Sequence, residues 1–326
     1  MKICLVGHLG NRPDEGVRKL AYCLANLLAK QHDIMTLNIS CLTSWRKIRA
    51  FQPDIIHYIL CPTGIGLVTA KIISLTYPKA KTVISAPQSA ISAKAKWLSL
   101  FRPDIVLVQS YQSEKVFKLL GYRTQFLPNG VDIQKFTPVD VETKQKLRRK
   151  YGLPNDKFVI LHMASFKKGR NLEVLKKLQL SNKHNQVLIV GRPSERGDED
   201  VINELKEAGC LIWNDYFPNL EEVYGLSDCY IFPTVNKRNS IEMPLSVLEA
   251  MSCNLPVITT RFCALPRIFD EGGGFFFAEK EEDFFKWIEE IKKGNLEVKT
   301  REKVLPYSWN IVTKRLVGIY EKLIHN

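Results

Sequence analysis

Short apolar runs alternate with longer segments of helical period along most of the chain. In each short run the apolar residues are consecutive, as expected for strands covered on both faces. The longer segments repeat apolar residues every three or four positions, as at 16–30, 113–120, 171–178 and 245–252. Strand and helix in alternation predict parallel, doubly wound α/β sheets. The predicted strands are 2–6, 34–38, 55–59, 82–85, 105–108, 158–162, 186–190, 230–232 and 256–259.

The chain is long enough for two domains. It has 326 residues, of which 45% are hydrophobic and 25% charged. The apolar pattern weakens at 139–151, which is polar and highly charged, and a new strand pattern begins at 158. We therefore expect one Rossmann-like domain at 1–138 and a second at 139–307. Two such domains that face each other form a ligand cleft, because open α/β sheets bind ligands at the carboxyl ends of their strands.

Positive charge is concentrated in the first half of the chain. Residues 1–150 contain 23 Lys and Arg against 9 Asp and Glu, a net +14, and residues 151–326 contain 24 against 25, a net −1, in agreement with the total of +13. A basic domain attracts phospholipid headgroups, lipid-linked phosphates or nucleic acid. Because no nucleic-acid-binding motif is present, we expect no nucleic-acid partner.

The sequence predicts a cytoplasmic protein. Its eight cysteines are spaced singly, with no C-x-x-C pair, as is typical of small apolar side chains in a reducing compartment. The N-terminus enters a strand pattern directly and is not a signal peptide. The longest apolar stretch, 59–70, is too short to span a bilayer. The protein is expected to be either soluble or peripheral on the inner face of the cell membrane.

One segment has the composition of an interfacial amphipathic stretch. Residues 92–102 interleave Lys94, Lys96 and Arg102 with Trp97 and other apolar residues. Such a segment can place a basic domain on an anionic membrane. The alternative is a solvated helix face with Trp97 packed inward.

Residues 127–138, LPNGVDIQKFTP, are rich in turn formers, and Asn129-Gly130 can adopt the positive φ of a turn. The whole segment closely resembles the N-G-V-D-x-x-x-F-x-P signature of family 4 glycosyltransferases, the glycosyl transferases of group 1. In that family the signature lies at the mouth of the interdomain cleft. The resemblance therefore implies that Asn129 and Gly130 line the cleft.

A second segment, 244–258, places Glu249 inside an otherwise apolar helix, where a carboxylate must find hydrogen-bond donors. The residue is either an exposed helix carboxylate or an acceptor for ribose hydroxyls of a nucleotide. In the second case the amides near Leu245 and Ser246, which follow Pro244, would meet the diphosphate.

This segment resembles the family pattern E-G-F-G-x-x-x-L-E-A-M, in which two glutamates are eight positions apart. The position eight before Glu249 is Ile241, and the nearest acid is Glu242. Either a shift of one residue lets Glu242 contact the donor sugar, or that role is lost and Glu242 is a surface carboxylate.

A basic loop, 165–172, lies between a predicted strand and a predicted helix. Arginine suits bidentate contact with phosphate, and a diphosphate leaving group needs cations nearby. The loop resembles the family pattern R-x-x-x-x-K-G-x-x-x-L, which places Ser165 on the family arginine and Arg170 on the family lysine. Arg170 is the first candidate for the phosphate cation and Lys168 the second; the alternative is a solvated basic turn.

Weaker resemblances extend over nearly the whole chain. Gly191 and Arg192 match the glycine loop after the second strand of the donor domain, and Gly16 opens a helix where the family has a loop close to the donor phosphates. Residues 308–326 match the closing helix, which in GT-B proteins returns to the first domain. The resemblance implies catalytic roles for Arg170, Glu242 and Glu249.

Together these features predict a GT-B fold, with two Rossmann-like domains that face each other across a cleft. The resemblance implies a retaining glycosyltransferase that moves a hexose from a nucleotide-diphosphate sugar to a hydroxyl of a glycan, glycolipid or lipid-linked acceptor, in cell-surface glycan or glycolipid synthesis. The sequence contains no D-x-D motif and no carboxylate or histidine cluster with ligand spacing, so we expect no metal and no separate cofactor. His8 and His57 are expected to be structural.

Two alternatives stay open at this point. One is a nucleotide-sugar epimerase or a phosphorylase on the same fold. The other is a non-catalytic basic protein that binds membranes or nucleic acid.

Overall fold

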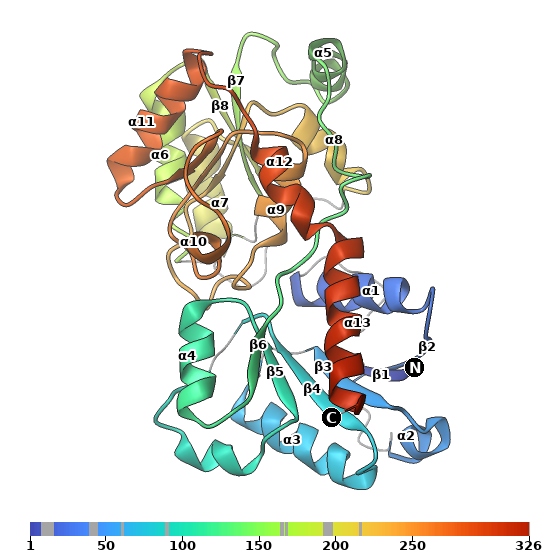
Figure 1. The fold of residues 1–326 in the computed structure, drawn as a ribbon. Helices are drawn as coiled ribbons and strands as arrows, with labels where there is room; N and C mark the ends of the chain where they lie inside the picture. Colours follow the sequence, from blue (N-terminus) through green and yellow to red (C-terminus); the bar gives the residue numbers. More distant parts are fainter. Residues whose placement is uncertain are drawn as a thin grey trace. The chain divides into compact units, whose positions relative to one another are not determined.

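A computed structural model divides the chain into two compact units. The N-terminal unit contains Met1–Gly130, Ser240–Met243 and Trp309–Asn326, and the C-terminal unit contains Val131–Asn239 and Pro244–Ser308. Each unit is built around its own six-stranded sheet (Figure 1). The structure describes residues 1–7, 16–38, 45–59, 62–88, 91–163, 166, 169–191, 198–214 and 217–325.

The sheet of the N-terminal unit is parallel throughout, with strand order β2-β1-β3-β4-β5-β6. All five residues of β3 are buried, as predicted for a strand covered on both faces. The strands are β1 (Lys2–Gly7), β2 (Asp33–Asn38), β3 (Ile55–Ile59), β4 (Lys81–Ala86), β5 (Ile105–Val108) and β6 (Thr124–Phe126).

Helices cover both faces of this sheet. One face packs against α2 (Trp45–Phe51), α3 (Gly64–Thr76), η2 (Lys96–Leu100) and α4 (Tyr111–Leu119), and together they form one apolar cluster. The other face is covered by α1 (Gly16–Leu28) and by α13 (Trp309–His325), from the far end of the sequence (Figure 1).

A buried histidine attaches α13 to the sheet. His57 of β3 has its Nδ1 2.6 Å from the hydroxyl oxygen of Tyr320 in α13, and its Nε2 2.8 Å from Oγ of Ser85 in β4. Burial lowers the pKa of His57 to about 3, so the ring is neutral at physiological pH. This is the structural role expected for His57; His8 lies outside the described residues.

The sheet of the C-terminal unit is also parallel, with strand order β12-β11-β10-β7-β8-β9. Its strands are β7 (Phe158–Met163), β8 (Asn185–Val190), β9 (Leu211–Trp213), β10 (Cys229–Phe232), β11 (Val257–Thr259) and β12 (Phe275–Phe277). The two parallel sheets confirm the predicted α/β class.

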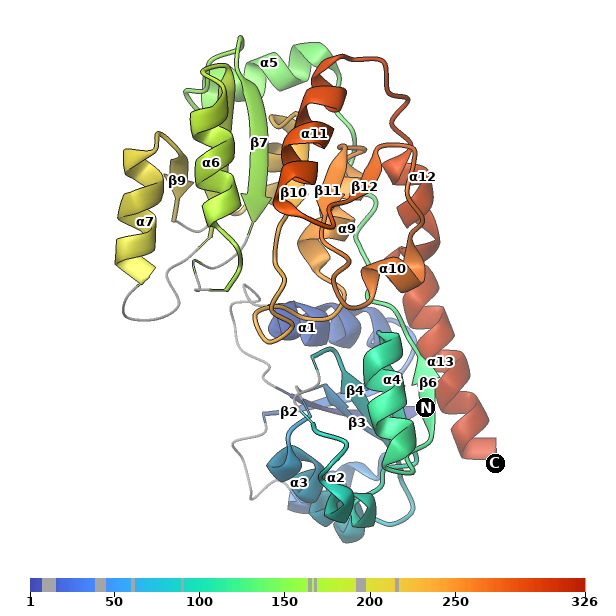
Figure 2. The same ribbon diagram turned by 90° about the vertical axis from the view of Figure 1, so that its left-hand side faces the viewer.

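The helices of the C-terminal unit form two layers. One face of the sheet carries α6 (Glu173–Ser181), α7 (Asp198–Glu207) and α11 (Glu281–Lys292), which share an apolar cluster (Figure 2). The opposite layer is built on α9, which packs against β10 and β11. The remaining helices of this unit are α5 (Val141–Lys150), α8 (Leu220–Gly225), α9 (Leu245–Ser252), α10 (Leu265–Ile268), α12 (Thr300–Val304) and η3 (Leu305–Tyr307).

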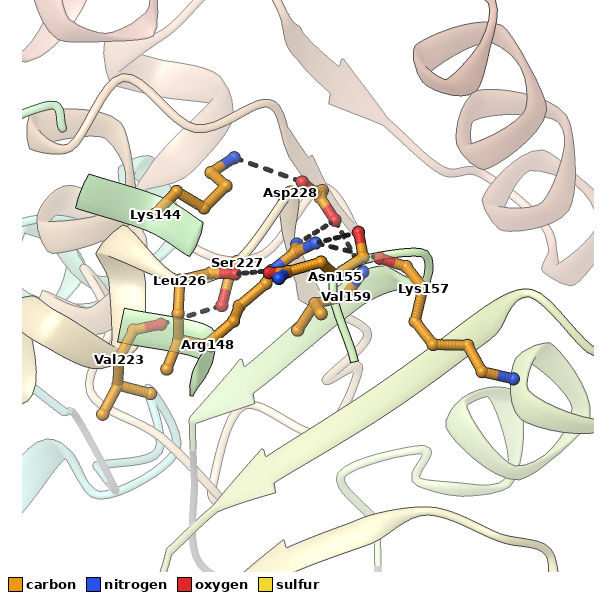
Figure 3. Close-up of polar contacts among 9 residues, drawn as sticks. All are labelled: Lys144, Arg148, Asn155, Lys157, Val159, Val223, Leu226, Ser227 and Asp228. Carbon is orange, nitrogen blue, oxygen red and sulfur yellow. Dashed lines mark hydrogen bonds and ion pairs between the residues drawn. The ribbon is translucent and has the colours of Figure 1, made fainter. Parts of the chain in front are cut away.

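The polar segment at 139–151 is a helix, α5, although it lacks a strong apolar face. Asp140 caps its N-terminus by accepting a hydrogen bond from the amide of Thr143 at 2.7 Å. Arg148 then fastens the helix to the unit, as Figure 3 shows: its buried guanidinium reaches Asp228 Oδ2 at 2.5 Å and donates to three backbone carbonyls, those of Leu226, Asn155 and Lys157. The domain boundary predicted after Pro138 lies beyond the division at Gly130.

Candidate functional site

The sheet of the C-terminal unit has a switch point between β7 and β10. From β7, the first strand of the unit, the chain continues to β8 and β9 on one side, and it later builds β10, β11 and β12 on the other. Ligands of open α/β sheets bind at the carboxyl ends of the strands beside such a point. The segments that follow β7 and β10 are therefore the first candidates for a binding site.

Arg170 follows β7, on the loop that leads to α6. Gly169 before it has a φ of 87°, and a Cβ at that position would lie 2.8 Å from Nδ2 of Asn239, so the loop requires glycine. The Nε atom of Arg170 is buried and has no hydrogen-bond partner. Burial lowers the pKa of Arg170 to about 10, with nearby Tyr230 acting in the opposite direction, so the group stays charged at neutral pH. A half-buried cation with a buried, open donor favours an anionic ligand.

His162, next to last in β7, carries another buried atom without a partner. Its Nδ1 lies 2.9 Å from the carbonyl oxygen of Ile231 and must carry the ring proton, whereas its Nε2 is buried and unpartnered. Burial lowers the pKa of His162 to about 4; the Ile231 carbonyl opposes this shift and the charge of Arg170 adds to it. The ring is therefore a neutral acceptor at physiological pH.

Thr234, two residues after the end of β10, is fully buried, and its Oγ1 has no partner. Buried polar atoms are nearly always hydrogen-bonded in proteins. Three of them, on Arg170, His162 and Thr234, lie on the two segments that flank the switch point. They are the groups that a bound ligand would satisfy.

Glu249 of α9 is a buried carboxylate, 5% exposed. The hydroxyl of Tyr224 donates to its Oε2 at 2.8 Å. Burial and the negative charge of Glu249 both raise the pKa of Tyr224 well above its usual value, so the phenol keeps its proton. The alternative of an exposed helix carboxylate is therefore wrong. Contact between Glu249 and ribose hydroxyls stays a prediction.

The first turn of α9 is fixed to β10. Pro244, the N-cap, makes no side-chain capping bond. The Oγ of Ser246 accepts a hydrogen bond from Tyr230 of β10 at 2.7 Å, and burial raises the pKa of that tyrosine. The amides near Leu245 and Ser246 thus begin a helix that is anchored to a strand of the switch point. A helix start favours an anion, and its contact with a diphosphate stays a prediction.

The other residues predicted for the donor site are only partly described. Gly191 directly follows β8, and its amide donates to the carbonyl oxygen of Trp213 at 3.0 Å. Ser165, Lys168 and Arg192 lie outside the described residues.

Glu242 belongs to the N-terminal unit. It is 5% exposed, and its carboxylate accepts hydrogen bonds from the Ser110 amide, at 3.0 Å to Oε2, and from the Ser113 hydroxyl through Oε1. The alternative of a surface carboxylate is therefore wrong, and contact with a donor sugar stays a prediction. The neighbouring Ile241 packs on Gly16, where a Cβ would lie 3.1 Å from the Ile241 side chain.

Asn129 and Gly130 are tightly packed within the same unit. Asn129 is 1% exposed; its Nδ2 donates to the Met243 carbonyl at 2.7 Å, and its Oδ1 accepts from Gln109 at 2.5 Å. A Cβ on Gly130 would lie 2.4 Å from the ring of Trp309. Gly130 is not one of the described glycines with positive φ, so close approach of the ring, rather than a turn, requires the glycine. Their place at a cleft mouth stays a prediction.

The predicted interfacial segment contains η2. Its Trp97 is 56% exposed and meets the ring of Phe101 edge-on at 6.0 Å, so the alternative with Trp97 packed inward is wrong. Lys94, Lys96 and Arg102 are exposed. Within the ranges that the structure describes, no helix is both long enough and apolar enough to cross a bilayer.

Residues 143–308 match the protein family Glycosyl transferases group 1. The match covers half of the chain and includes Arg170 and Glu249. The chain belongs to this family. The family predicted from the sequence is thereby confirmed; the 244–258 segment lies within the matched residues, and the 127–138 segment lies outside them.

Relatives of this group 1 chain act on different substrates, to judge by their names. It is 26% identical over 219 residues to D-inositol 3-phosphate glycosyltransferase of Corynebacterium jeikeium, covering 60% of this chain and 51% of the relative. It is 23% identical over 212 residues to alpha-monoglucosyldiacylglycerol synthase of Acholeplasma laidlawii, covering 61% and 52%. The chain thus spans about half the length of these relatives.

The crystal structure of Anabaena HepE, solved with UDP and glucose, has the same fold. The TM-score is 0.78 at 16% sequence identity, and the match covers 99% of this chain and 100% of HepE. Two Rossmann-like units of the GT-B fold are therefore confirmed for this group 1 glycosyl transferase.

Several side chains of this group 1 glycosyl transferase escaped the sequence patterns. His162 and Tyr230 lie in apolar strand runs and resemble core residues, and only the pairing of β7 with β10 brings their segments together. Ser110 and Ser113, the partners of Glu242, gave no signal beyond that of a helix start. Among the described residues, no group of three His, Cys, Asp or Glu side chains is placed to hold a metal ion.

Proposed function

We propose that this chain is a retaining glycosyltransferase that transfers a sugar from a nucleotide-diphosphate sugar to an acceptor hydroxyl. The observation that carries the proposal is the half-buried, charged side chain of Arg170, whose buried Nε is unpartnered after the carboxyl end of β7. Family membership and the likeness to HepE, which was crystallised with UDP, support it.

In this proposal the C-terminal unit holds the donor. Arg170 binds the diphosphate, the first-turn amides of α9 after Pro244 add further donors, and Glu249 accepts hydrogen bonds from the ribose hydroxyls. The further residues that we propose to contact the donor are Gly16, Ser165, Lys168, Gly191 and Arg192.

The reaction that we propose proceeds on one face of the sugar. The bond between the anomeric carbon and the leaving phosphate oxygen breaks, and its electron pair stays on the diphosphate. The acceptor oxygen bonds to the same carbon from the same face, which retains the configuration, and the acceptor proton passes to the leaving phosphate. Arg170 stabilises the charge that develops on the diphosphate, so no covalent enzyme intermediate is needed.

The acceptor that we propose is a glycan, a glycolipid or a lipid-linked sugar, in cell-surface glycan or glycolipid synthesis. One relative is named a glucosyldiacylglycerol synthase, and the first 150 residues carry a net +14. Exposed Trp97, with Lys94, Lys96 and Arg102, suits an anionic membrane surface. We place the enzyme in the cytoplasm, peripheral on the inner face of the cell membrane.

A thermal-shift panel tests the donor site. UDP, GDP, ADP, CMP and their sugar conjugates are added to the wild type, to Arg170→Ala and to Glu249→Gln. We expect one nucleotide class to raise the melting temperature of the wild type, because it binds only the native state. Loss of Arg170 should weaken that binding about 10- to 100-fold, as expected for charged hydrogen bonds. Lys177→Ala is the matched control, because it removes an exposed lysine of α6 that pairs with Glu281.

The panel, followed by analysis of the products formed from any nucleotide sugar that binds, also separates the alternatives. If no nucleotide stabilises the wild type, the proposed function is wrong. Binding of anionic vesicles in that case would favour the alternative of a non-catalytic, membrane-binding protein. If a nucleotide sugar binds and is epimerised or phosphorolysed, with no transfer to any hydroxyl acceptor, the chain is an enzyme of the other class.

A further inference from the structure

Four residues from the middle of the sequence, Ser240–Met243, complete the carboxyl edge of the sheet in the N-terminal unit. They make hydrogen bonds to the segments that follow three neighbouring strands, β4, β5 and β6. The Glu242 amide donates to the carbonyl of Pro87, after β4, at 2.6 Å, and the Met243 carbonyl accepts from Asn129, after β6. The segment therefore fills positions where an open α/β sheet would otherwise bind a ligand.

The Glu242 carboxylate makes the central contacts of this segment. Ser110, the N-cap of α4, and Ser113, in the first turn, both donate to it, one from the backbone and one from the side chain. A carboxylate at a helix N-terminus is stabilised by the unpaired amides and the helix dipole. Both carboxylate oxygens are thus engaged, and the residue is almost fully buried.

Ile241, the position that matches the first glutamate of the family pattern, is also committed within the unit. It is 7% exposed and packs against Gly16, the first residue of α1. Its neighbour Met243 is held twice by Asn129, through its carbonyl and, at 3.1 Å from the Asn129 amide, through its sulfur. Three consecutive residues, Ile241, Glu242 and Met243, are therefore fixed within the N-terminal unit.

We infer that Glu242 is a positioning residue that locks the Ser240–Met243 segment onto the first turn of α4, and that it does not offer a carboxylate to the donor sugar. The next residue, Pro244, is the N-cap of the helix that carries Glu249, so the lock ends where that helix begins. Its effect on transfer rests on the proposed function; the lock itself does not.

Hydrogen exchange tests the lock without any substrate. In the wild type the Ser110 amide is held by Glu242, and Glu242→Ala should speed its exchange about 10-fold or more. Ser113→Ala should change it in the same direction, and the double variant should add little to Glu242→Ala, because the two side chains act as one unit. Glu242→Gln should keep the protection, since its oxygen can accept from the amide while its NH2 donates to the Ser113 hydroxyl.

Activity measurements then separate positioning from donor contact. With UDP-glucose, GDP-mannose or ADP-glucose, whichever stabilises the wild type, Glu242→Gln should keep kcat and donor KM within about threefold. Glu242→Ala and Ser113→Ala should lose kcat together. Glu114→Ala is the control, because it removes a first-turn carboxylate of the same helix that instead pairs with Lys118 at 2.6 Å.

Two results would overturn the inference. One is an unchanged exchange rate of the Ser110 amide in Glu242→Ala. The other is a Glu242→Gln protein that keeps this amide protected but loses turnover as fully as Glu242→Ala, which would show that the charge itself acts on the donor. If no nucleotide sugar binds the wild type, the proposed function fails, while the exchange experiment still decides the lock.

Discussion

Gly130 and Gly318 in the N-terminal unit show how far a single side-chain carbon changes the packing. A Cβ at Gly130 would lie 2.4 Å from the ring of Trp309, whereas a Cβ at Gly318 of α13 would meet nothing within 4 Å. The sequence marks Gly130 as a turn residue in a family signature, but the ring that requires it comes from residue 309. A contact between positions so far apart in the chain cannot be read from local pattern.

We expect opposite effects from alanine at these two glycines. Gly130→Ala should destabilise the protein by about 1–3 kcal/mol, because the ring of Trp309 must move. Gly318→Ala should stabilise it by about 0.5–1 kcal/mol, because alanine is the better helix former and the space is open. Urea unfolding of the two variants measures both effects. Equal destabilisation by both would show that chain flexibility, not the ring, decides the cost at Gly130.

The candidate site was predictable in its composition but not in its partners. An acid in an apolar helix predicts a buried carboxylate that needs a donor, and Glu249 is such a residue. The hydrogen-bond donor is Tyr224, 25 residues earlier in the chain. It reaches Glu249 because α8 packs against α9. Glu242 is a harder case, because the sequence places it beside the donor helix while the structure assigns it to the other unit.

At the scale of elements, strand prediction succeeded inside the sheets and at one edge, β2, and it missed the other three edges. Strands β3 and β5 have the predicted bounds, and seven others agree to within one residue at each end. The three strands missed, β6, β9 and β12, have three residues each and are sheet edges. Apolar runs of three residues or fewer are too short to stand out from the surrounding sequence.

Helix α5 was missed for a different reason. Amphipathic patterns detect helices that are held by an apolar stripe, but the buried residue of α5 is an arginine, which donates hydrogen bonds to three backbone carbonyls. Such an anchor has no periodicity, so 139–151 resembled a linker.

We predict that the Arg148 anchor is strongly stabilising. Arg148→Ala should lower the free energy of unfolding of the C-terminal unit by about 2–4 kcal/mol, because it leaves Asp228 and three backbone carbonyls short of a partner. Lys144→Ala removes the other cation on Asp228, 3.1 Å away and more exposed, and should cost less than about 1 kcal/mol. Denaturant unfolding compares the two. Similar losses in both variants would mean that charge alone, rather than the buried donor set in Figure 3, holds α5.

At the scale of the whole molecule, the described part of each unit contains a fully buried neutral histidine, His57 in the first and His162 in the second. Burial lowers their pKa values from 6.5 to about 3 and about 4. As the pH falls below 6.5, these histidines bind protons in the unfolded chain but stay neutral in the folded chain. Their full contribution to the free energy of unfolding is therefore present above pH 6.5 and is lost as the pH falls.

Each unit should therefore lose about 2 kcal/mol between about pH 7.5 and about pH 5 through its histidine. Urea unfolding across this range measures the loss. In His57→Gln and in His162→Gln, the number of protons taken up on unfolding should fall by about one. This holds whatever free energy of unfolding the variant loses at neutral pH. His184→Gln, which removes an exposed imidazole, is the control. If the free energy of unfolding of both buried-site variants depended on pH as in the wild type, the two histidines would not be neutral in the folded protein as described.

The course of the chain between the units has a consequence for its synthesis. All residues of the C-terminal unit, 131–239 and 244–308, are translated before α13, whereas the N-terminal unit lacks α13 until the last part of the sequence is made. The C-terminal unit, although translated second, is thus the first unit whose residues are all synthesised. On the ribosome, the part of the early half's sheet that α13 covers stays uncovered until α13 is made.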